Sequence, residues 1–236
     1  GGSEGGRSGA RGRSGLEDAI LVAGRELPVQ LRGRVATNQV APFALLVLLL
    51  FGFALDADRS VLVRATPGLF WLAVLFCSLL ATQRAFAVEA ADGNRDALRL
   101  SGMHPSGILL GKGLAIAAEL VVLEVVLLAG VAVLYGTDLD GVLQLALTCA
   151  TATVGLAAAG TLYGALAAGL RVRDTLLPLL LLPVVAPVLI AATRAFDDAL
   201  GTVGVDGWAW VSLLSVFAAL YTVLGLAAAG PLLEEA

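Results

Sequence analysis

The sequence has few of the side chains on which enzymes and metal proteins depend. It contains one histidine, one methionine and two cysteines in 236 residues, and only 14% of its residues are charged. A serine triad needs a histidine partner. The one histidine, His104, stands beside Met103, and adjacent side chains cannot bind the two faces of one haem iron. We therefore expect a protein that is not an enzyme and that binds no cofactor or metal directly.

The cysteines and one glycine-rich run indicate no redox or nucleotide site either. Cys77 and Cys149 lie far apart in apolar runs without a CxxC pattern, so we expect two buried free thiols. The run Ser106-Gly-Ile-Leu-Leu-Gly111-Lys112-Gly113 looks like a phosphate-binding loop. It lacks the first glycine and the final serine or threonine of that motif, and no strand precedes it. We expect no nucleotide to bind there.

Apolar residues are abundant, at 58% of the chain, and the mean hydropathy is strongly positive. A helix needs about 20 mostly apolar residues to cross the hydrocarbon core of a membrane. Six runs approach that length, although the first is short and the fourth is long. They are Val40–Leu55, Pro67–Ala85, Ile108–Leu134, Val142–Leu170, Leu176–Ala195 and Trp208–Leu233. We expect an all-α, polytopic membrane protein with six transmembrane helices and no soluble catalytic domain.

Basic residues gather on one side of this topology. Six arginines precede the first span, four basic residues flank or fill the second connection, and two lie in the fourth. The opposite side holds only Arg59, Arg64 and Arg194. Because lysine and arginine are enriched in cytoplasmic loops, we expect the second and fourth connections and both termini to face the cytoplasm.

The part of the chain before the first span has two compositions. Residues 1–15 are glycine, serine, alanine and arginine with one acid, which cannot bury apolar surface, so we expect disorder. Residues 16–39 begin with apolar side chains at Leu16, Ile20, Ala23 and Leu27, spaced along one helix face. This pattern favours an amphipathic helix in the membrane interface, ahead of a six-span domain over residues 40–233.

Two acids, Glu119 and Glu124, lie inside the third span. An ionised acid near mid-membrane costs at least about 2.5–3.5 kcal/mol on insertion scales, so such residues mark candidate functional sites. Five residues place the two carboxylates about 140° apart around a helix, which argues against a shared metal or acid–base site. Glu124 either carries a charge or proton in a pathway or subunit contact, or is a protonated acid bonded to a neighbouring helix. The same alternatives stand for Glu119.

The fourth and fifth spans carry packing and bending signals. Gly160-Thr-Leu-Tyr-Gly164 is a GxxxG motif, which lets helices approach closely, either between two copies or within one chain. The fifth span contains Pro178, Pro183 and Pro187, each of which removes a backbone hydrogen bond. This helix is either permanently kinked or a hinge.

The second connection and its borders, residues 89–107, form a polar segment between two spans. Asp92-Gly93 indicates a turn, and the sequence after it, from Arg95 to Leu100, suits a short surface helix. Ser-Gly-Met-His-Pro then ends that helix, and Pro105-Ser106 begins the next span. Such a segment is either a handle for a soluble partner or a solvated turn.

Five runs of this chain occur together in a known family. They are Gly68-Leu-Phe-Trp71-Leu-Ala, Glu89-Ala-Ala-Asp-Gly93, Asp96-Ala-Leu98-Arg-Leu, Pro105-Ser with Gly111-Lys112, and the proline run of the fifth span. From about Arg25 to Tyr221 the chain resembles haem exporter protein B (CcmB), the permease subunit of an ABC-type complex of cytochrome c maturation.

The resemblance implies a bacterial inner-membrane permease of the ABC exporter type, with a homodimer within the complex as one arrangement. Its partners would be the cytoplasmic ATPase CcmA, the membrane proteins CcmC and CcmD, and the haem chaperone CcmE. ATP hydrolysis by CcmA would release haem-loaded CcmE, so the complex handles haem and the permease itself need not carry it. Lys112 would anchor the third span. The ATPase would grip a coupling helix through Glu89, Asp92, Gly93, Arg95, Leu98 and Arg99.

Two other functions fit parts of the pattern. A permease exporting a lipid, peptide or drug would share the fold and the handle. A channel would need a polar helix face, for which Gln144, Thr148, Thr151 and Thr153 are the nearest candidates, but they lie near one end of the fourth span. This face does not predict a channel. The sequence also shows no convincing cluster of acids, histidines or cysteines that would predict a membrane enzyme.

Overall fold

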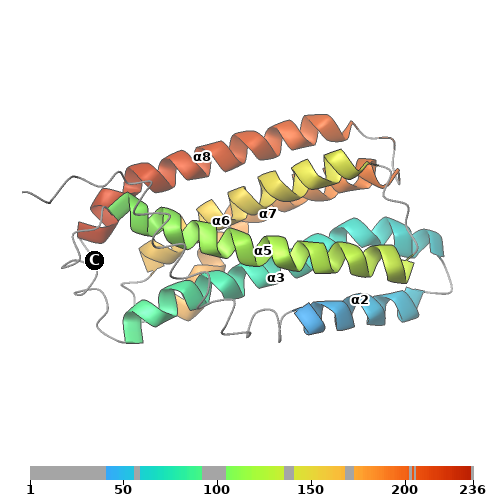
Figure 1. Ribbon diagram of the computed structural model, residues 1–236, viewed down its shortest axis with the longest axis horizontal. Helices are drawn as coiled ribbons and strands as arrows, with labels where there is room; N and C mark the ends of the chain where they lie inside the picture. The colour runs from blue at the N-terminus through green and yellow to red at the C-terminus, as the bar shows by residue number, and fades with distance from the viewer. Residues whose placement is uncertain are drawn as a thin grey trace, which may run out of the picture.

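The computed structural model describes residues 41–55, 59–91, 105–135, 141–167, 173–201, 204 and 206–234. These residues form a bundle of helices that lie lengthwise beside one another (Figure 1). The helices are α2 (Ala41–Leu55), α3 (Arg59–Ala91), α5 (Pro105–Tyr135), α6 (Val142–Ala167), α7 (Arg173–Ala199) and α8 (Gly207–Glu234). The expected all-α fold with six apolar helices is confirmed over the described part of the chain.

Five of these helices are long and apolar enough to cross a membrane, and α2 is the exception. The candidate spans are Val61–Ala87, Ser106–Val133, Val142–Ala167, Thr175–Ala199 and Gly207–Ala229. Helix α2 has 15 residues, which at about 1.5 Å per residue is shorter than the hydrocarbon core. It packs beside α3 and α5 along part of their length (Figure 1).

Helix α3 differs most from the expected bounds. It begins eight residues before Pro67 and continues six residues past Ala85 to Ala91, so Glu89, which was expected in the connection, lies within the helix. Pro67 does not end the helix, although a proline removes one backbone hydrogen bond. The coupling segment therefore has its first residues in α3 and its last, Pro105–Gly107, in α5.

The small residues of α6 let neighbouring helices approach it closely. A side chain at Gly160 would come within 2.6 Å of the Thr82 hydroxyl, and one at Gly164 would collide with the Phe86 ring. Both neighbours belong to α3 of the same chain. The GxxxG motif thus serves packing within one chain, the second of the two readings above.

Aromatic stacking joins α3 to α7 at the core. The Phe70 and Phe196 rings stack with centroids 4.7 Å apart, and Trp71 meets Phe196 edge-on at 6.2 Å. All three side chains are fully buried. Because such pairs add about 0.5–1.5 kcal/mol beyond area burial, this cluster fixes α7 against α3 near the end of α7.

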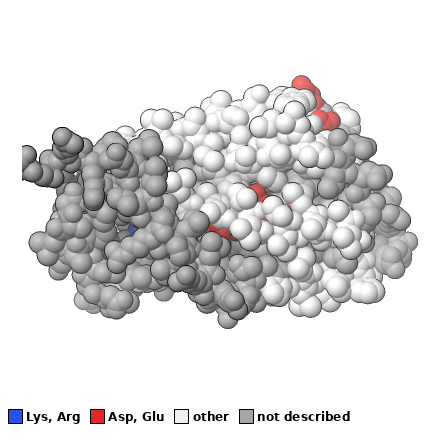
Figure 2. Space-filling view, viewed as in Figure 1, with Lys and Arg blue, Asp and Glu red and all other residues white. Residues whose placement is uncertain are grey.

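The outer surface is apolar. Large hydrophobic side chains on α2, α5, α7 and α8 are exposed, among them Phe53, Val125, Leu179 and Val216. Few basic or acidic atoms are visible on the described residues of the face that Figure 2 shows. This surface suits lipid hydrocarbon and not water.

Several expectations concern residues that the structure does not describe. The glycine- and arginine-rich head (1–15), the amphipathic segment (16–39) and residues 92–104 lie outside the described ranges. Asp92, Gly93, Arg95, Leu98, Arg99 and His104 belong to this group.

Candidate functional site

Most hydroxyl groups inside the spans bond to their own helix. Thr82 donates to the Ser78 carbonyl, Thr148 to the Gln144 carbonyl and Thr222 to the Ala218 carbonyl, at 2.7–2.8 Å. This back-bonding satisfies a hydroxyl without a partner helix. A hydroxyl that bonds to a different helix therefore indicates a specific contact between the two helices.

Thr153 is such a case. Its hydroxyl donates to Glu124 Oε1 at 2.7 Å, which joins α6 to α5 inside the bundle. Glu124 is only 2% exposed and Thr153 is 1% exposed. A buried carboxyl group is stable only with hydrogen-bond partners, so Thr153 explains how α5 tolerates this acid. The sequence singled out both residues but gave no reason to pair them.

Glu119 faces a different neighbour. Its Oε1 atom lies 3.6 Å from the Arg84 guanidinium on α3, and both side chains are partly exposed. The expected separation of the two acids around α5 is confirmed, because Glu124 faces α6 and Glu119 faces α3. The sequence counted Arg84 only as a residue bordering the second connection, so it gave no signal for this pair.

Lys112 ties α5 to α3 beside the coupling segment. Its ammonium group donates to the Ala85 carbonyl at 2.8 Å and lies 5.1 Å from the centroid of the Phe86 ring. The side chain is 3% exposed. Ala85 lies six residues before the end of α3, and Lys112 seven residues after the start of α5. The two helices that frame the segment are thus linked by a buried charge at its base.

A polar network at the other end of the bundle escaped sequence analysis. Asp198 Oδ2 on α7 accepts hydrogen bonds from Gln144 Nε2 at 2.9 Å and from the Gly207 amide at 3.1 Å. Gln144 also donates to the Ala195 carbonyl at 3.2 Å. This network joins α6, α7 and the start of α8. Gln144 is thus buried in this network. The channel hypothesis would have required it to line a pore.

The three prolines lie within one unbroken helix, α7. Pro183 and Pro187 face outward, whereas Leu181, Val185 and Val188 between and beside them are buried. A bend at the prolines would therefore change the outer face of α7 before it disturbed the inner packing. The arrangement is compatible with both a fixed kink and a hinge.

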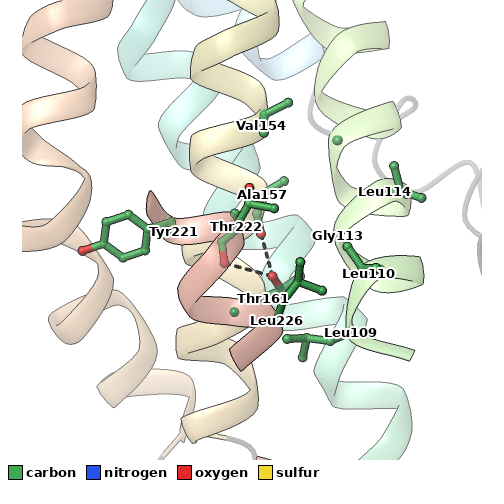
Figure 3. Close-up of a pocket in the computed structure, with 13 residues that line it drawn as sticks. Leu109, Leu110, Gly113, Leu114, Val154, Ala157, Thr161, Tyr221, Thr222 and Leu226 are labelled. Atoms are coloured by element: carbon green, nitrogen blue, oxygen red, sulfur yellow. Dashed lines mark hydrogen bonds between the residues drawn. The ribbon is translucent and has the colours of Figure 1, made fainter. Parts of the chain in front are cut away.

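One pocket opens between α5, α6 and α8, with a volume of about 150 Å³ (Figure 3). Leu109, Gly113, Ala157 and Leu226 are among its lining residues, and no charged side chain is. The Thr161 hydroxyl at its wall donates to the Ala157 carbonyl of its own helix. The pocket thus offers mainly hydrocarbon contacts.

Chemistry-bearing clusters are scarce in the described part of the chain. No group of three or more histidine, cysteine or acidic residues that could hold a metal ion occurs there. Cys77 and Cys149 are both buried free cysteines, as expected. What the described residues offer are buried polar ties between helices.

The fold and these ties define a multi-pass membrane protein of the permease type. Residues 18–234 match the profile of the CcmB protein family. The chain therefore belongs to the CcmB family.

Curated relatives agree with this assignment. The chain is 32% identical to heme exporter protein B of Haemophilus influenzae over 176 residues, covering 74% of this chain and 79% of the relative. It is 33% identical to the Escherichia coli K12 protein of the same name over 186 residues, covering 78% and 83%. The Pseudomonas aeruginosa protein is 29% identical over 210 residues, covering 88% and 94%.

Proposed function

We propose that this chain is the membrane subunit of an ABC-type complex that exports or handles haem in cytochrome c maturation. The observation that carries the proposal is the match of residues 18–234 to the CcmB family, together with the match of 74% and 78% of the chain to two proteins named heme exporter protein B. In this proposal the chain hydrolyses no nucleotide. A cytoplasmic ATPase of the CcmA kind binds the segment between α3 and α5, and its ATP cycle releases the haem-loaded chaperone CcmE from CcmC, with CcmD as a further partner.

The contacts beside that segment support a mechanical role. Force applied to residues 92–104 acts on the ends of α3 and α5, which Lys112 holds together through the Ala85 carbonyl. Phe86, beside this contact, packs against Gly164 of α6. A displacement of the segment is therefore passed to three helices together, which is what a lever attached to a helical body requires.

Helix α7 is the element that we propose bends in response. Its prolines leave carbonyl groups without their usual helical donors, which lowers the cost of bending. Its far end is fixed by the Phe70–Phe196 stack and by Asp198. Motion would thus concentrate at Pro178, Pro183 and Pro187.

The test compares cytochromes in cells that lack the chain. We expect deletion to abolish all c-type cytochromes and to leave b-type cytochromes unchanged, as judged by haem staining and reduced spectra. Haem that stays covalently attached to the chaperone when the ATPase is inactivated would support the same role. An exporter of lipid, peptide or drug would leave c-type cytochromes intact and would overturn the proposal.

The coupling segment has its own test. We expect the double variant Asp92→Ala with Leu98→Ala to insert normally but to lose c-type cytochromes and to stop co-purifying with the ATPase. Asp206→Ala at the other end of the bundle is the matched control, because it also removes an acid beside a helix end. If the double variant matures cytochromes and retains the ATPase, the assignment of this segment is wrong.

A further inference from the structure

The pocket between α5, α6 and α8 is bordered by glycines that close helix packing does not require. A Cβ atom at Gly113 would lie 3.5 Å from the Thr161 methyl group, and one at Gly225 would lie 3.8 Å from Leu109 Cδ2. These are ordinary contact distances, unlike the close approaches that a Cβ atom would meet at the GxxxG glycines of α6. Larger side chains have room at Gly113 and Gly225, so these glycines leave open space on the α5 and α8 walls of the pocket.

The pocket lies in the hydrocarbon of one leaflet. Its α5 wall, within residues 109–117, begins 3 and ends 11 residues after Ser106, where the candidate span starts. Its α8 wall, within residues 221–226, lies 3 to 8 residues before Ala229, where that span ends. At about 1.5 Å per residue, these walls lie roughly 5–17 Å inside the spans. Half of the hydrocarbon core is about 15 Å thick, so the pocket faces the acyl chains of the leaflet beside the coupling segment.

The described side chains that line the pocket present no group that needs a polar ligand. The hydroxyl groups of Thr161 and Thr222 donate to carbonyls of their own helices, at 3.0 and 2.7 Å. The Tyr221 hydroxyl points away from the other lining residues (Figure 3). None of the lining residues is charged. A water molecule or a headgroup would therefore lose hydrogen bonds on entering, whereas an alkyl chain has none to lose.

The size of the pocket suits a short length of alkyl chain. Its volume of about 150 Å³ equals that of an engineered protein cavity that holds one benzene molecule. On that scale the pocket takes about six chain carbons. A whole helix, about 10–12 Å across with its side chains, is too wide to enter. Leu114, Val154 and Leu226 border the pocket and are exposed, so a lipid chain reaches it without separating the helices.

We propose that this pocket binds part of an acyl chain of a membrane phospholipid. The chain enters between α5 and α8 and lies against Ala157 and Ala158 of α6, while its headgroup stays at the membrane surface. Protein interiors are packed more densely than a liquid hydrocarbon. The carbons in the pocket therefore gain more dispersion contacts than they have among other lipid tails, and the helices lose a void.

Photolabelling locates the chain. The full-length protein is reconstituted in vesicles of phosphatidylethanolamine and phosphatidylglycerol with a trace of phospholipid that carries a diazirine at mid-chain. Labelled residues are identified by mass spectrometry. We expect at least about fivefold more label on Gly113 and Ala157 than on Val223, which is 63% exposed at the same depth on α8. Equal labelling would mean that lipid meets the pocket only as it meets any outer surface, and would overturn the proposal.

Filling the pocket tests the same site. Gly225→Leu adds an isobutyl group to the α8 wall, and Gly68→Leu, the matched control, adds it to an exposed glycine of α3 with open space around it. We expect Gly225→Leu to lower the labelling of Ala157 by about tenfold or more and Gly68→Leu to leave it unchanged. Gly113→Leu fills the pocket from α5 and should have the same effect as Gly225→Leu. If both filling variants insert and keep full labelling of Ala157, the proposal is wrong.

Thermal unfolding and native membranes give independent readouts. A ligand that binds only the folded state raises the unfolding midpoint. We expect added phospholipid to raise the midpoint in detergent more for the unchanged chain than for Gly225→Leu, and equal shifts would contradict the proposal. Labelling in vesicles but not in native membranes that contain the same lipid would mean that a protein side chain occupies the pocket, which would also overturn it. These readouts do not involve cytochromes, so they stand apart from the proposed function.

Discussion

The two ends of the bundle are held together in different ways. Where α7 ends and α8 begins, Asp198 and Gln144 form three hydrogen bonds that join α6, α7 and α8, and the Gly141 amide also donates to the Ala199 carbonyl. Where α3 ends and α5 begins, among the described residues, the buried Lys112 bonds to the Ala85 carbonyl and lies over the Phe86 ring. A satisfied polar network rigidifies the helices that it joins. We infer that the α7–α8 end is the fixed end and the α3–α5 end the moving one.

Removing Asp198 should break the fixed end and cause the largest loss of stability. Its carboxylate accepts two hydrogen bonds, and bonds to a charged group contribute about 1.5–3 kcal/mol each. Because the site is only partly buried, we expect Asp198→Ala to lower stability by about 2–3 kcal/mol. The measurement is the thermal unfolding midpoint in detergent.

The control for this prediction is Asp206→Ala. Asp206 is exposed and accepts one bond, from the Trp208 amide at the start of α8. Loss of such a capping group costs about 1 kcal/mol. Equal shifts in the two variants would contradict the idea that Asp198 centres a network.

Between the two ends, Thr153→Val should remove the donor that Glu124 uses while keeping the side-chain volume. A buried carboxyl group left without its partner costs about 1–3 kcal/mol.

Glu124→Gln keeps an oxygen that accepts from Thr153, so we expect little loss of stability from it. Cytochrome content in the Glu124→Gln strain then separates the two readings of this acid. Normal levels of c-type cytochromes would indicate that Glu124 serves only the packing of α5 against α6. Loss of c-type cytochromes would show that its charge or proton is needed.

The sequence predicted the helices of this fold better than the contacts between them. Runs such as Val142–Leu170 give span positions because lipid imposes a minimum apolar length on each helix. The Asp198–Gln144 network could not be foreseen, since its partners are 54 residues apart and nothing local pairs them. The limits of α3 were missed for a related reason. The second span was expected to end at Ala85 because polar residues follow it, and no local pattern shows that the helix continues to Ala91.

Changing the moving end should affect function more than stability. Lys112→Met keeps most of the side-chain stem, and its packing on Phe86, but removes the bond to the Ala85 carbonyl. The lost bond contributes about 1.5–3 kcal/mol, but removing a buried ammonium group also removes its desolvation cost, so we expect a net loss of stability smaller than for Asp198→Ala. We expect c-type cytochromes to fall further in Lys112→Met than in Asp198→Ala at matched protein levels. If c-type cytochromes fell further in Asp198→Ala than in Lys112→Met, the α3–α5 end would not be the moving end.

Pro183→Ala should have the smallest effect on stability and tests where the body bends. In a soluble helix interior, proline is about 3 kcal/mol less favourable than alanine. In a membrane helix, neighbouring groups and local adjustments satisfy much of what a proline leaves open, so the gain here should be well below that figure. Pro183 faces outward, so alanine there removes no inner packing. If α7 bends during the cycle, the straighter helix should mature fewer c-type cytochromes although it unfolds at the same or a higher temperature. Unchanged cytochromes in the triple variant Pro178→Ala, Pro183→Ala and Pro187→Ala would mean that the kink is fixed, and the motion would then have to lie in the α3–α5 pair.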